Sequence, residues 1–317
     1  MDGPKKHDKE PETLSGGNFT MNTNRFFGGL AASFLVVACG GSDQSEEDIA
    51  KSTEETKLSY ATQFDTILAA DHRTPQESAR DGHRHPKETL LFFGIEPNMS
   101  VVEVWPGGGW YTQVIAPFLK TGGGKYYAAS FAREGANERI LASLNAYHDL
   151  YVARPEIYGD VTMSALTGPI APDGPVDAIL TFRNLHNWIA QGVADDYLAD
   201  FFEALKPGGV FGIVQHRANG SGAPRDGSWG YVYTDDVIAL AEDAGFVFEE
   251  AAEINANPAD TKDHPFGVWT LPPVSRTSTV QGMQSPDFDP ARYATIGESD
   301  RMTLRFRKPG TKTFTSE

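Results

Sequence analysis

The sequence predicts an α/β fold, in which a mostly parallel sheet carries helices on both faces. Between about residues 100 and 250, short apolar runs of strand length alternate with longer segments whose apolar residues recur at helical spacing. This alternation is typical of strand–helix–strand crossover units, which build parallel sheets. In addition, 317 residues with 40% apolar content provide enough chain for one large domain with its own core.

The first residues predict an export signal and not a folded domain. Residues 1–20 are polar, and we expect translation to start at Met21. Residues 21–38 then have the layout of a signal peptide, because one positive charge at Arg25 precedes thirteen apolar residues, FFGGLAASFLVVA. Such a stretch is too short to form a stable membrane span.

The end of this stretch resembles a bacterial lipobox. The residues LVVA stand directly before Cys39, the only cysteine of the chain. The resemblance implies that Cys39 is lipidated and anchors the protein to the membrane, facing the periplasm, and Gly40 favours the outer membrane. Residues 39–59, rich in Ser, Asp and Glu, then form a flexible tether. The alternative is a buried apolar segment with an incidental free cysteine.

Residues 60–94 predict a helical extension in front of the sheet. Thr74 and Pro75 offer an N-cap and a first-turn proline for a short helix. The histidines at 83 and 85 lie in the same region, on either side of Arg84. Because residues two apart diverge on a helix, we interpret this run as a solvent-facing helix surface and expect no metal there. A metal site completed by a distant histidine stays open as the alternative.

Seven apolar runs downstream have the length and residue types of strands. The strongest is VDAILTF, and the weakest is the third run. We expect strands at these positions: 101–105, 125–130, 157–161, 176–182, 210–215, 246–253 and 302–306.

Helices separate these strands. A Lys-Pro-Gly-Gly sequence ends one of them, Thr234 is expected to cap another, and Gly245 is expected to stop it. Residues 255–300 are rich in Pro, Asn, Asp and Gly and show little periodicity. We expect a long loop region there, either the lid or wall of a site or a tolerated insertion. We expect helices at these positions: 110–119, 136–150, 193–205 and 234–244.

Composition excludes several classes of function. Lys and Arg number 27 against 43 Asp and Glu, so the net charge is −16. A protein that binds nucleic acid through its phosphates needs a basic excess, so we expect no nucleic-acid partner. One cysteine also excludes a disulfide framework and a multi-cysteine metal site.

A glycine-rich turn follows the first strand. Glu103 lies in the strand, and Gly107, Gly108 and Gly109 stand before the next helix. Glycines let a ligand approach the backbone closely, and a helix N-terminus presents unpaired amides. A phosphate loop does not fit, because no Lys-Ser/Thr follows. The dinucleotide fingerprint does not fit either, because Thr112 stands where it needs its last glycine.

The turn and the later motifs resemble class I S-adenosylmethionine-dependent methyltransferases. In VVEVWPGGG, Glu103 matches the acid of the family's first motif, and Gly107 and Gly109 match its second and third glycines. Asp160 lies where the family has a loop acid near the adenine. The sequences VDAIL and LKPGG resemble the fourth strand and the turn before the fifth strand.

More narrowly, the chain resembles an exported group of predicted bacterial methyltransferases. The shared segments are EVWPGGGWYT, the polar residues from Arg183 to Trp188, QHRA from Gln215, and ESDRM from Glu298. The motifs of the wider family cover about residues 100–250, and ESDRM lies beyond them.

The resemblance implies a Rossmann-like class I methyltransferase fold over residues 60–310, followed by a tail at 311–317. It also implies S-adenosylmethionine as cofactor and methyl transfer to a small-molecule acceptor. The residues that it assigns to cofactor binding are Glu103, Gly107, Gly108, Gly109, Tyr111, Ser130, Asp160 and Asn184.

Two positions depart from the family. Its second strand ends in an acid that binds the ribose hydroxyls, whereas this one ends at Ser130, which can form only a neutral hydrogen bond. Trp105 replaces the first glycine, and Pro106 after it favours an extended backbone. The indole could stack on an adenosyl group, line the site of another ligand, or simply pack.

Polar residues follow the fourth and fifth strands and form a candidate reaction site. Ligands of open parallel sheets bind beyond the carboxyl ends of the strands, where we expect these residues to meet. His186 or His216 could accept a proton from the acceptor, since histidine titrates near neutrality. Arg183 or Arg217 could hold an anionic acceptor.

The predicted export conflicts with the predicted cofactor, because S-adenosylmethionine is made in the cytosol and an exported protein would lack it. Two alternatives therefore stay open. The protein could be a non-catalytic envelope protein that binds another small molecule on the same fold, or a histidine- or metal-assisted enzyme on that scaffold.

Overall fold

The computed structural model describes residues 46–220, 222–280, 283, 285 and 288–310. The polar leader, the predicted signal peptide, Cys39 and the tail at 311–317 lie outside the described residues.

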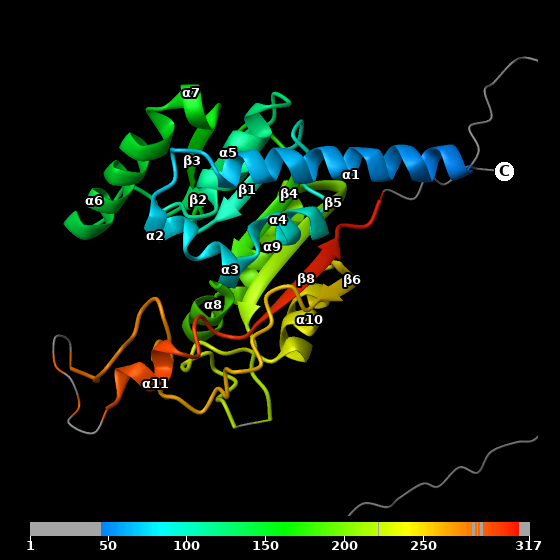
Figure 1. The fold of residues 1–317 in the computed structure, drawn as a ribbon. Helices are drawn as coiled ribbons and strands as arrows, with labels where there is room; N and C mark the ends of the chain where they lie inside the picture. The colour runs from blue at the N-terminus through cyan, green and yellow to red at the C-terminus, as the bar shows by residue number, and fades with distance from the viewer. Residues whose placement is uncertain (1–45, 221, 281–282, 284, 286–287, 311–317) are drawn as a thin grey trace, which may run out of the picture. The chain divides into compact units, whose positions relative to one another are not determined.

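One seven-stranded sheet forms the centre of the described domain (Figure 1). Its strands are β1 (Ser100–Val104), β2 (Lys125–Ser130), β3 (Val161–Ala165), β4 (Val176–Phe182), β5 (Leu205–His216), β6 (Val247–Ala252) and β8 (Arg301–Arg307). They lie in the order β3-β2-β1-β4-β5-β8-β6, and only β8 runs antiparallel to its neighbours. The predicted fold class is confirmed. The strand order reverses between β1 and β4, which is where such sheets place a ligand crevice.

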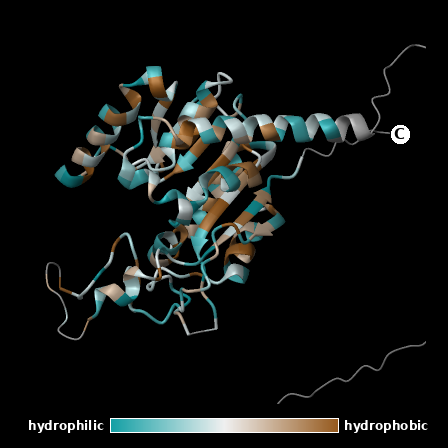
Figure 2. Ribbon diagram, in the orientation of Figure 1, coloured by the Kyte–Doolittle hydropathy of each residue, from teal (hydrophilic) through white to brown (hydrophobic). Residues whose placement is uncertain are grey.

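Helices pack against both faces of this sheet and create two apolar cores. On β1, Val101 belongs to one core and Val102 and Val104 to the other, because successive strand residues point to opposite faces. In Figure 2 the apolar residues gather in the central strands, as expected for a sheet that is covered on both sides. The first core includes α1 (Glu46–Leu68), α4 (Pro86–Phe92) and α5 (Thr112–Lys120), and the second includes α8 (Leu185–Gln191), α9 (Ala194–Ala204) and α10 (Thr234–Asp243).

The helical extension before the sheet is confirmed. Besides α1 and α4 it contains α2 (Pro75–Ser78) and α3 (Asp81–Arg84). Thr74 caps α2 as predicted, with its hydroxyl accepting from the N–H of Glu77 while the Glu77 carboxylate accepts from the N–H of Thr74. This capping box fixes the chain just before the residues that approach the sheet edge.

α1 begins inside the segment predicted as a tether. The helix starts at Glu46, and residues 51–59 are helical although they are exposed. Its second half is docked, with Phe64 stacked on Phe118 of α5 at 4.1 Å between ring centroids. Residues with good helix propensity, such as Glu54 and Lys57, extend the helix outward from this docked half. The tether prediction is therefore wrong from residue 46 onward.

The third strand is displaced from its predicted position. We expected it at 157–161, but β3 covers Val161–Ala165, and Pro155–Tyr158 forms a short helix, α7. Pro155 suits the first turn of a helix. β3 is an edge strand with mixed burial, so its apolar pattern is weak.

Other boundaries shift less. The predicted helix at 136–150 splits into α6 (Glu138–Tyr147) and a π-helical turn (His148–Val152). Thr234 is the first residue of α10 and not its cap, which is Tyr233. The predicted loop region 255–300 is largely irregular, with β7 (Pro265–Val268) and α11 (Pro290–Ala294) inside it. None of the helices that the structure describes is both long and apolar enough to cross a membrane.

Candidate functional site

A cavity of about 520 Å³ opens at the carboxyl ends of β1, β4 and β5. This volume is in the range of small-molecule sites, and we call it the site cavity. Its walls come from four parts of the chain: the helices before the sheet, the turn after β1, the ends of β4 and β5, and the long loop region at 268–274 and 298–299. Eight residues predicted for the site line it: Glu103, Gly107, Gly108, Tyr111, Arg183, Asn184, His186 and His216.

The β1 turn (residues 105–109) is open toward the cavity at two glycines. A Cβ atom added to Gly107 or Gly108 would meet no atom within 4 Å. Neither residue's N–H donates a hydrogen bond within the described residues. Two free donors beside open space form a concavity that suits an anionic or carbonyl oxygen.

Gly109 has a different task in the same turn. Its φ is 81°, and a Cβ there would lie 2.3 Å from the ring of Tyr151. The Tyr151 hydroxyl also donates to the carbonyl of Gly108 at 2.7 Å. Gly109 is therefore required by the packing of Tyr151 and does not line the site cavity.

Trp105 has a backbone conformation that favours glycine. Its φ is 49°, in the left-handed region, so the predicted extended conformation is wrong. The indole packs against Phe131, with the rings tilted by 30° and 5.2 Å between centroids, and meets Trp188 edge-on at 5.8 Å. These aromatic contacts offset the cost of the positive φ. The indole Nε1 is buried and has no partner among the described residues.

Glu103 is the buried acid of the cavity. It is 3% exposed, accepts a hydrogen bond from the Tyr126 hydroxyl, and lies 3.5 Å from the Thr112 hydroxyl. Burial raises the pKa of Glu103 to about 7, against the opposing influence of Tyr126 and Arg183. Near neutral pH this carboxyl group exists in both protonation states.

Tyr111 and Asn184 line the cavity but are held by the protein. The Tyr111 ring stacks on Phe182 at 3.5 Å between centroids, and its hydroxyl donates to the carbonyl of Arg84. The Asn184 amide donates to the carbonyl of Val104 at 2.9 Å, which ties the end of β4 to the end of β1. Both residues keep the strand ends in place.

His186 is fixed as a neutral hydrogen-bond donor. The Gln215 amide nitrogen lies 3.1 Å from the carbonyl of Gly230 and 3.2 Å from Nδ1 of His186. An amide nitrogen can only donate, so Nδ1 accepts and the ring proton sits on Nε2. Burial lowers the pKa of His186 to about 4.

His216 lies beside it, at 5.5 Å between ring centroids. Its Nδ1 is 2.5 Å from the Ser299 hydroxyl. Burial lowers the pKa of His216 well below its usual value, and the nearby arginines lower it further. Both histidines are therefore neutral and poorly matched to hold a proton at neutral pH.

Four arginines surround one carboxylate at the cavity wall, and we call them the arginine cluster (Arg80, Arg84, Arg183 and Arg301). The first two and the last contact Glu298, with nitrogen–oxygen distances of 2.7, 3.1 and 3.2 Å. Burial alone would raise the pKa of Glu298, but these guanidinium groups hold it at about 2.

The cluster corrects one prediction made from the sequence. Arg84 was expected on a solvent-facing helix surface, yet it is 3% exposed. Its guanidinium also lies over the Trp110 ring, 4.6 Å from the centroid. The packing of α3 against the sheet edge turns this arginine inward. The sequence offered no signal for its meeting with Glu298, because 214 positions separate them.

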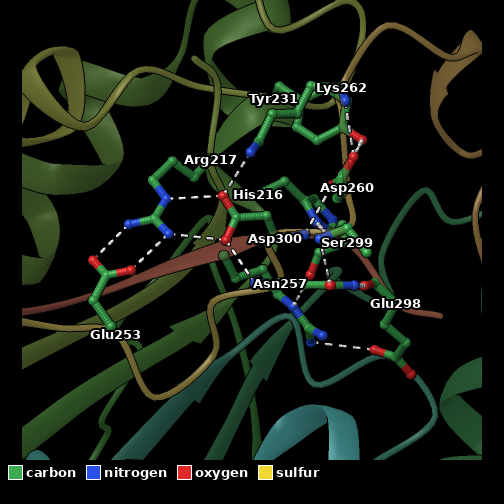
Figure 3. A network of polar contacts seen from close by, with 12 residues as sticks. His216, Arg217, Tyr231, Glu253, Asn257, Asp260, Lys262, Glu298, Ser299 and Asp300 are labelled. Atoms are coloured by element: carbon green, nitrogen blue, oxygen red, sulfur yellow. Dashed lines mark hydrogen bonds and ion pairs between the residues drawn. The ribbon is translucent and has the colours of Figure 1, made fainter. Parts of the chain in front are cut away.

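The long loop region forms a wall of the cavity and is held by a polar network (Figure 3). Arg217 forms ion pairs with Glu253 at 2.6 Å and Asp300 at 2.9 Å, and Lys262 reaches Asp300 at 2.9 Å. Asp260 accepts from the Tyr231 hydroxyl and lies 2.8 Å from His264. These contacts link the loop to the ends of β5 and β8. Arg217 is fully engaged in them and does not line the cavity.

Ser130 and Asp160 do not line the site cavity. Ser130, at the end of β2, lines a small void of about 10 Å³, which Pro106 and Gly107 of the β1 turn also line. Asp160 directly precedes β3, so it stands at the amino end of that strand, opposite the edge that carries the site. We expected Asp160 near the adenine because we placed the third strand at 157–161. Since β3 starts only at Val161, that expectation is wrong.

Among the residues that the structure describes, no three His, Cys, Asp or Glu side chains are grouped to hold a metal ion.

No family model and no curated protein matches the chain. Solved structures with a similar fold include a SAM-dependent methyltransferase from Aquifex aeolicus, 18% identical, with 62% of this chain and 93% of that chain covered and a TM-score of 0.44. A TehB-like SAM-dependent methyltransferase from Corynebacterium glutamicum is 14% identical, with 80% and 99% covered and a TM-score of 0.40. The [4+2]-cyclase SpnF is 14% identical, with 76% and 85% covered and a TM-score of 0.46. At 14–18% identity, these likenesses concern the fold alone.

Proposed function

We propose that the protein binds S-adenosylmethionine at the β1 turn and transfers its methyl group to a small-molecule acceptor in the site cavity. The observation that carries this proposal is the open pair Gly107 and Gly108, which line the cavity together with Glu103 and whose N–H groups donate no hydrogen bond within the described residues. The resemblance of the surrounding motifs to class I methyltransferases supports the same assignment.

The residues present fit the amino-acid end of this cofactor. The N–H groups of Gly107 and Gly108 would hold its carboxylate, and the carboxylate form of Glu103 would hold its ammonium group. When bound, S-adenosylmethionine supplies a methyl group activated by a sulfonium centre. The Nε2–H of His186 is placed to donate to a ligand in the same cavity.

The adenosyl end would meet an aromatic surface where the family has an acid. Trp105 and Phe131 stack beside the end of β2, and Phe131 is 48% exposed. An exposed aromatic ring can stack on a purine base, because the flat face of the base presents a π-system. The absence of a carboxylate there favours the second candidate, a binding protein of the same fold for another small molecule.

The proposal is tested by calorimetry with S-adenosylhomocysteine on the full chain and on Gly108→Val. This substitution fills the open turn without backbone strain, because Gly108 has no positive φ and no neighbour within 4 Å. Gly168→Val is the matched control, since Gly168 shares both properties but lies outside the cavity.

We expect binding by the natural protein and by Gly168→Val, and a loss of at least about tenfold in Gly108→Val. No heat with the natural protein up to about 1 mM ligand would refute cofactor binding. Binding of S-adenosylhomocysteine without methyl transfer from S-adenosylmethionine to any small molecule tested as acceptor would favour the second candidate.

We also propose that Cys39 carries a lipid anchor and that the domain faces the periplasm. The supporting observation is the apolar run that ends at the chain's only cysteine. Labelled palmitate should be incorporated in cells that express the protein and should be lost in Cys39→Ala. Equal labelling of both would contradict the anchor.

A further inference from the structure

Arg183 is a cation without a counter-charge of its own. It follows β4 directly, its φ is 66°, and it lines the site cavity. Its Nη1 is buried with no hydrogen-bond partner, and the side chain forms no ion pair within the described part of the chain. Arg183 is half-buried, and a charged group with a buried, unpartnered nitrogen in a strained conformation is costly; such costs are concentrated at functional sites.

The nearby acids do not neutralise this charge. Glu298 is the carboxylate closest to the arginine cluster, and it is shared by Arg80, Arg84 and Arg301. Glu103 is only partly ionised near neutral pH, because burial raises its pKa to about 7. Burial and the neighbouring arginines lower the pKa of Arg183 to about 10, so Arg183 stays charged.

The remaining acid of the cavity is engaged elsewhere. Glu77 accepts from the N–H of Thr74 at 2.7 Å and also from the side-chain amide of Gln113. Three arginines (Arg80, Arg84 and Arg183) therefore line the cavity together with Glu77, Glu298 and the partly protonated Glu103, and none of these carboxylates is bonded to Arg183.

Further donors point to the same kind of ligand. Arg80 has a buried Nη2 without a partner among the described residues. His186 presents a neutral Nε2–H, and no well-matched base stands beside it. Unpaired guanidinium groups and a neutral donor suit an oxyanion.

We propose that the methyl acceptor is a small anionic molecule, and that Arg183, assisted by Arg80, binds its carboxylate or phosphate group. This inference rests on the proposed function, because it assigns the acceptor of the same site. The cofactor's own carboxylate is a second source of the same chemistry, and the experiment separates the two.

The test uses calorimetry on the full chain with inorganic phosphate and with succinate, at constant ionic strength, with and without S-adenosylhomocysteine. Arg183→Gln removes the charge but keeps the strain of the positive φ at this position, since both residues carry a Cβ. Arg139→Gln is the matched control, because Arg139 is exposed on α6 and its loss changes the net charge equally.

We expect at least one anion to bind the natural protein and Arg139→Gln with S-adenosylhomocysteine present. Its affinity should fall by about tenfold to a hundredfold in Arg183→Gln, as for the loss of a charge-assisted hydrogen bond. Equal affinity in Arg183→Gln, or no binding of either anion to the natural protein, would overturn the proposal.

Two outcomes of the S-adenosylhomocysteine arm distinguish the sources. If the anions compete with S-adenosylhomocysteine and Arg183→Gln weakens both, Arg183 serves the cofactor's carboxylate and the acceptor proposal fails. If S-adenosylhomocysteine does not bind but an anion binds through Arg183, the proposed function fails while the anion site stands.

Discussion

Two arginines at the same edge of the sheet have opposite surroundings. Arg183 follows β4 and Arg217 follows β5, and the sequence suggested either as the holder of an anion. Arg217 meets Glu253 and Asp300, as Figure 3 shows, and these partners raise its pKa. Arg183 has no such partner, and burial lowers its pKa to about 10.

The difference separates structural charge from charge that is free to bind a ligand. Arg217 fastens the long loop region to the sheet, so its removal should cost stability. Arg183 forms no ion pair within the described chain, and Glu298 and Glu103 interact with its charge only through space. Its removal should cost binding and not stability. Five stability measurements test this contrast, in order of decreasing expected effect.

Glu298→Gln should have the largest effect. It would leave Arg84 and Arg301 buried without their carboxylate, so we expect a loss of about 3–5 kcal/mol in the free energy of unfolding. The folded-state pKa of about 2 lies below the ordinary 4.5, so this group's contribution is complete above pH 4.5 and is lost as pH falls toward 2. Denaturant titration across this range should show that acid loss in the natural protein but not in the variant. An unchanged unfolding free energy at pH 7 would contradict the assigned role.

Glu103 should produce a pH dependence of the opposite sign. Its folded-state pKa of about 7 lies above the ordinary 4.5, so the folded protein binds more protons between these values. Stability should fall as pH rises from 4.5 to 7, by on the order of 3 kcal/mol, and level off above. Glu103→Gln should abolish this slope.

The same pH window compares the two arginines. Arg183 lowers the pKa of Glu103, so Arg183→Gln should move the window upward, whereas Arg217→Gln should leave it in place. Equal shifts in both variants would mean that the two arginines do not differ as described.

Arg217→Gln should destabilise the fold by about 1–3 kcal/mol, because buried Asp300 loses two charge-assisted hydrogen bonds and keeps only Lys262 among its charged partners. Urea denaturation measures this value. Arg225→Gln is the control, since Arg225 is exposed and its contacts, an ion pair with Asp236 and the ring of Tyr233, lie at the surface. A cost no larger than that of the control would remove the structural role of Arg217.

Arg183→Gln should have the smallest and most informative effect on stability. Relief of an unpaired buried charge should leave the free energy of unfolding unchanged or raise it by about 1 kcal/mol. A loss of more than about 2 kcal/mol would mean that Arg183 is part of the structural frame.

The sequence predicted the frame of the site better than its walls. β2 and β4 lie where their apolar runs placed them, because strands buried on both faces carry continuous apolar patterns. The rule that ligands bind beyond the carboxyl ends of parallel strands correctly predicted that Glu103, Gly107 and His186 line one cavity. The predicted position of β3 was wrong because an edge strand carries a weak apolar pattern. The same error led us to expect Asp160 at the carboxyl end of this strand, whereas it lies at the amino end.

What the sequence did not predict depends on contacts between distant segments. Glu298 meets Arg80 across 218 positions, and no local pattern marks that meeting. The positive φ of Trp105 depends on the rings of Phe131 and Trp188, which local preferences do not include. The neutral state of His186 follows from one amide of Gln215, fixed in turn by the carbonyl of Gly230.

A crystal structure of the protein with S-adenosylhomocysteine and succinate tests the account most directly. We expect the homocysteine carboxylate at the N–H groups of Gly107 and Gly108, and a succinate carboxylate within hydrogen-bonding distance of the Arg183 guanidinium. A β1 turn closed by Trp105, or Arg183 bonded to the homocysteine carboxylate with no succinate in the cavity, would contradict it.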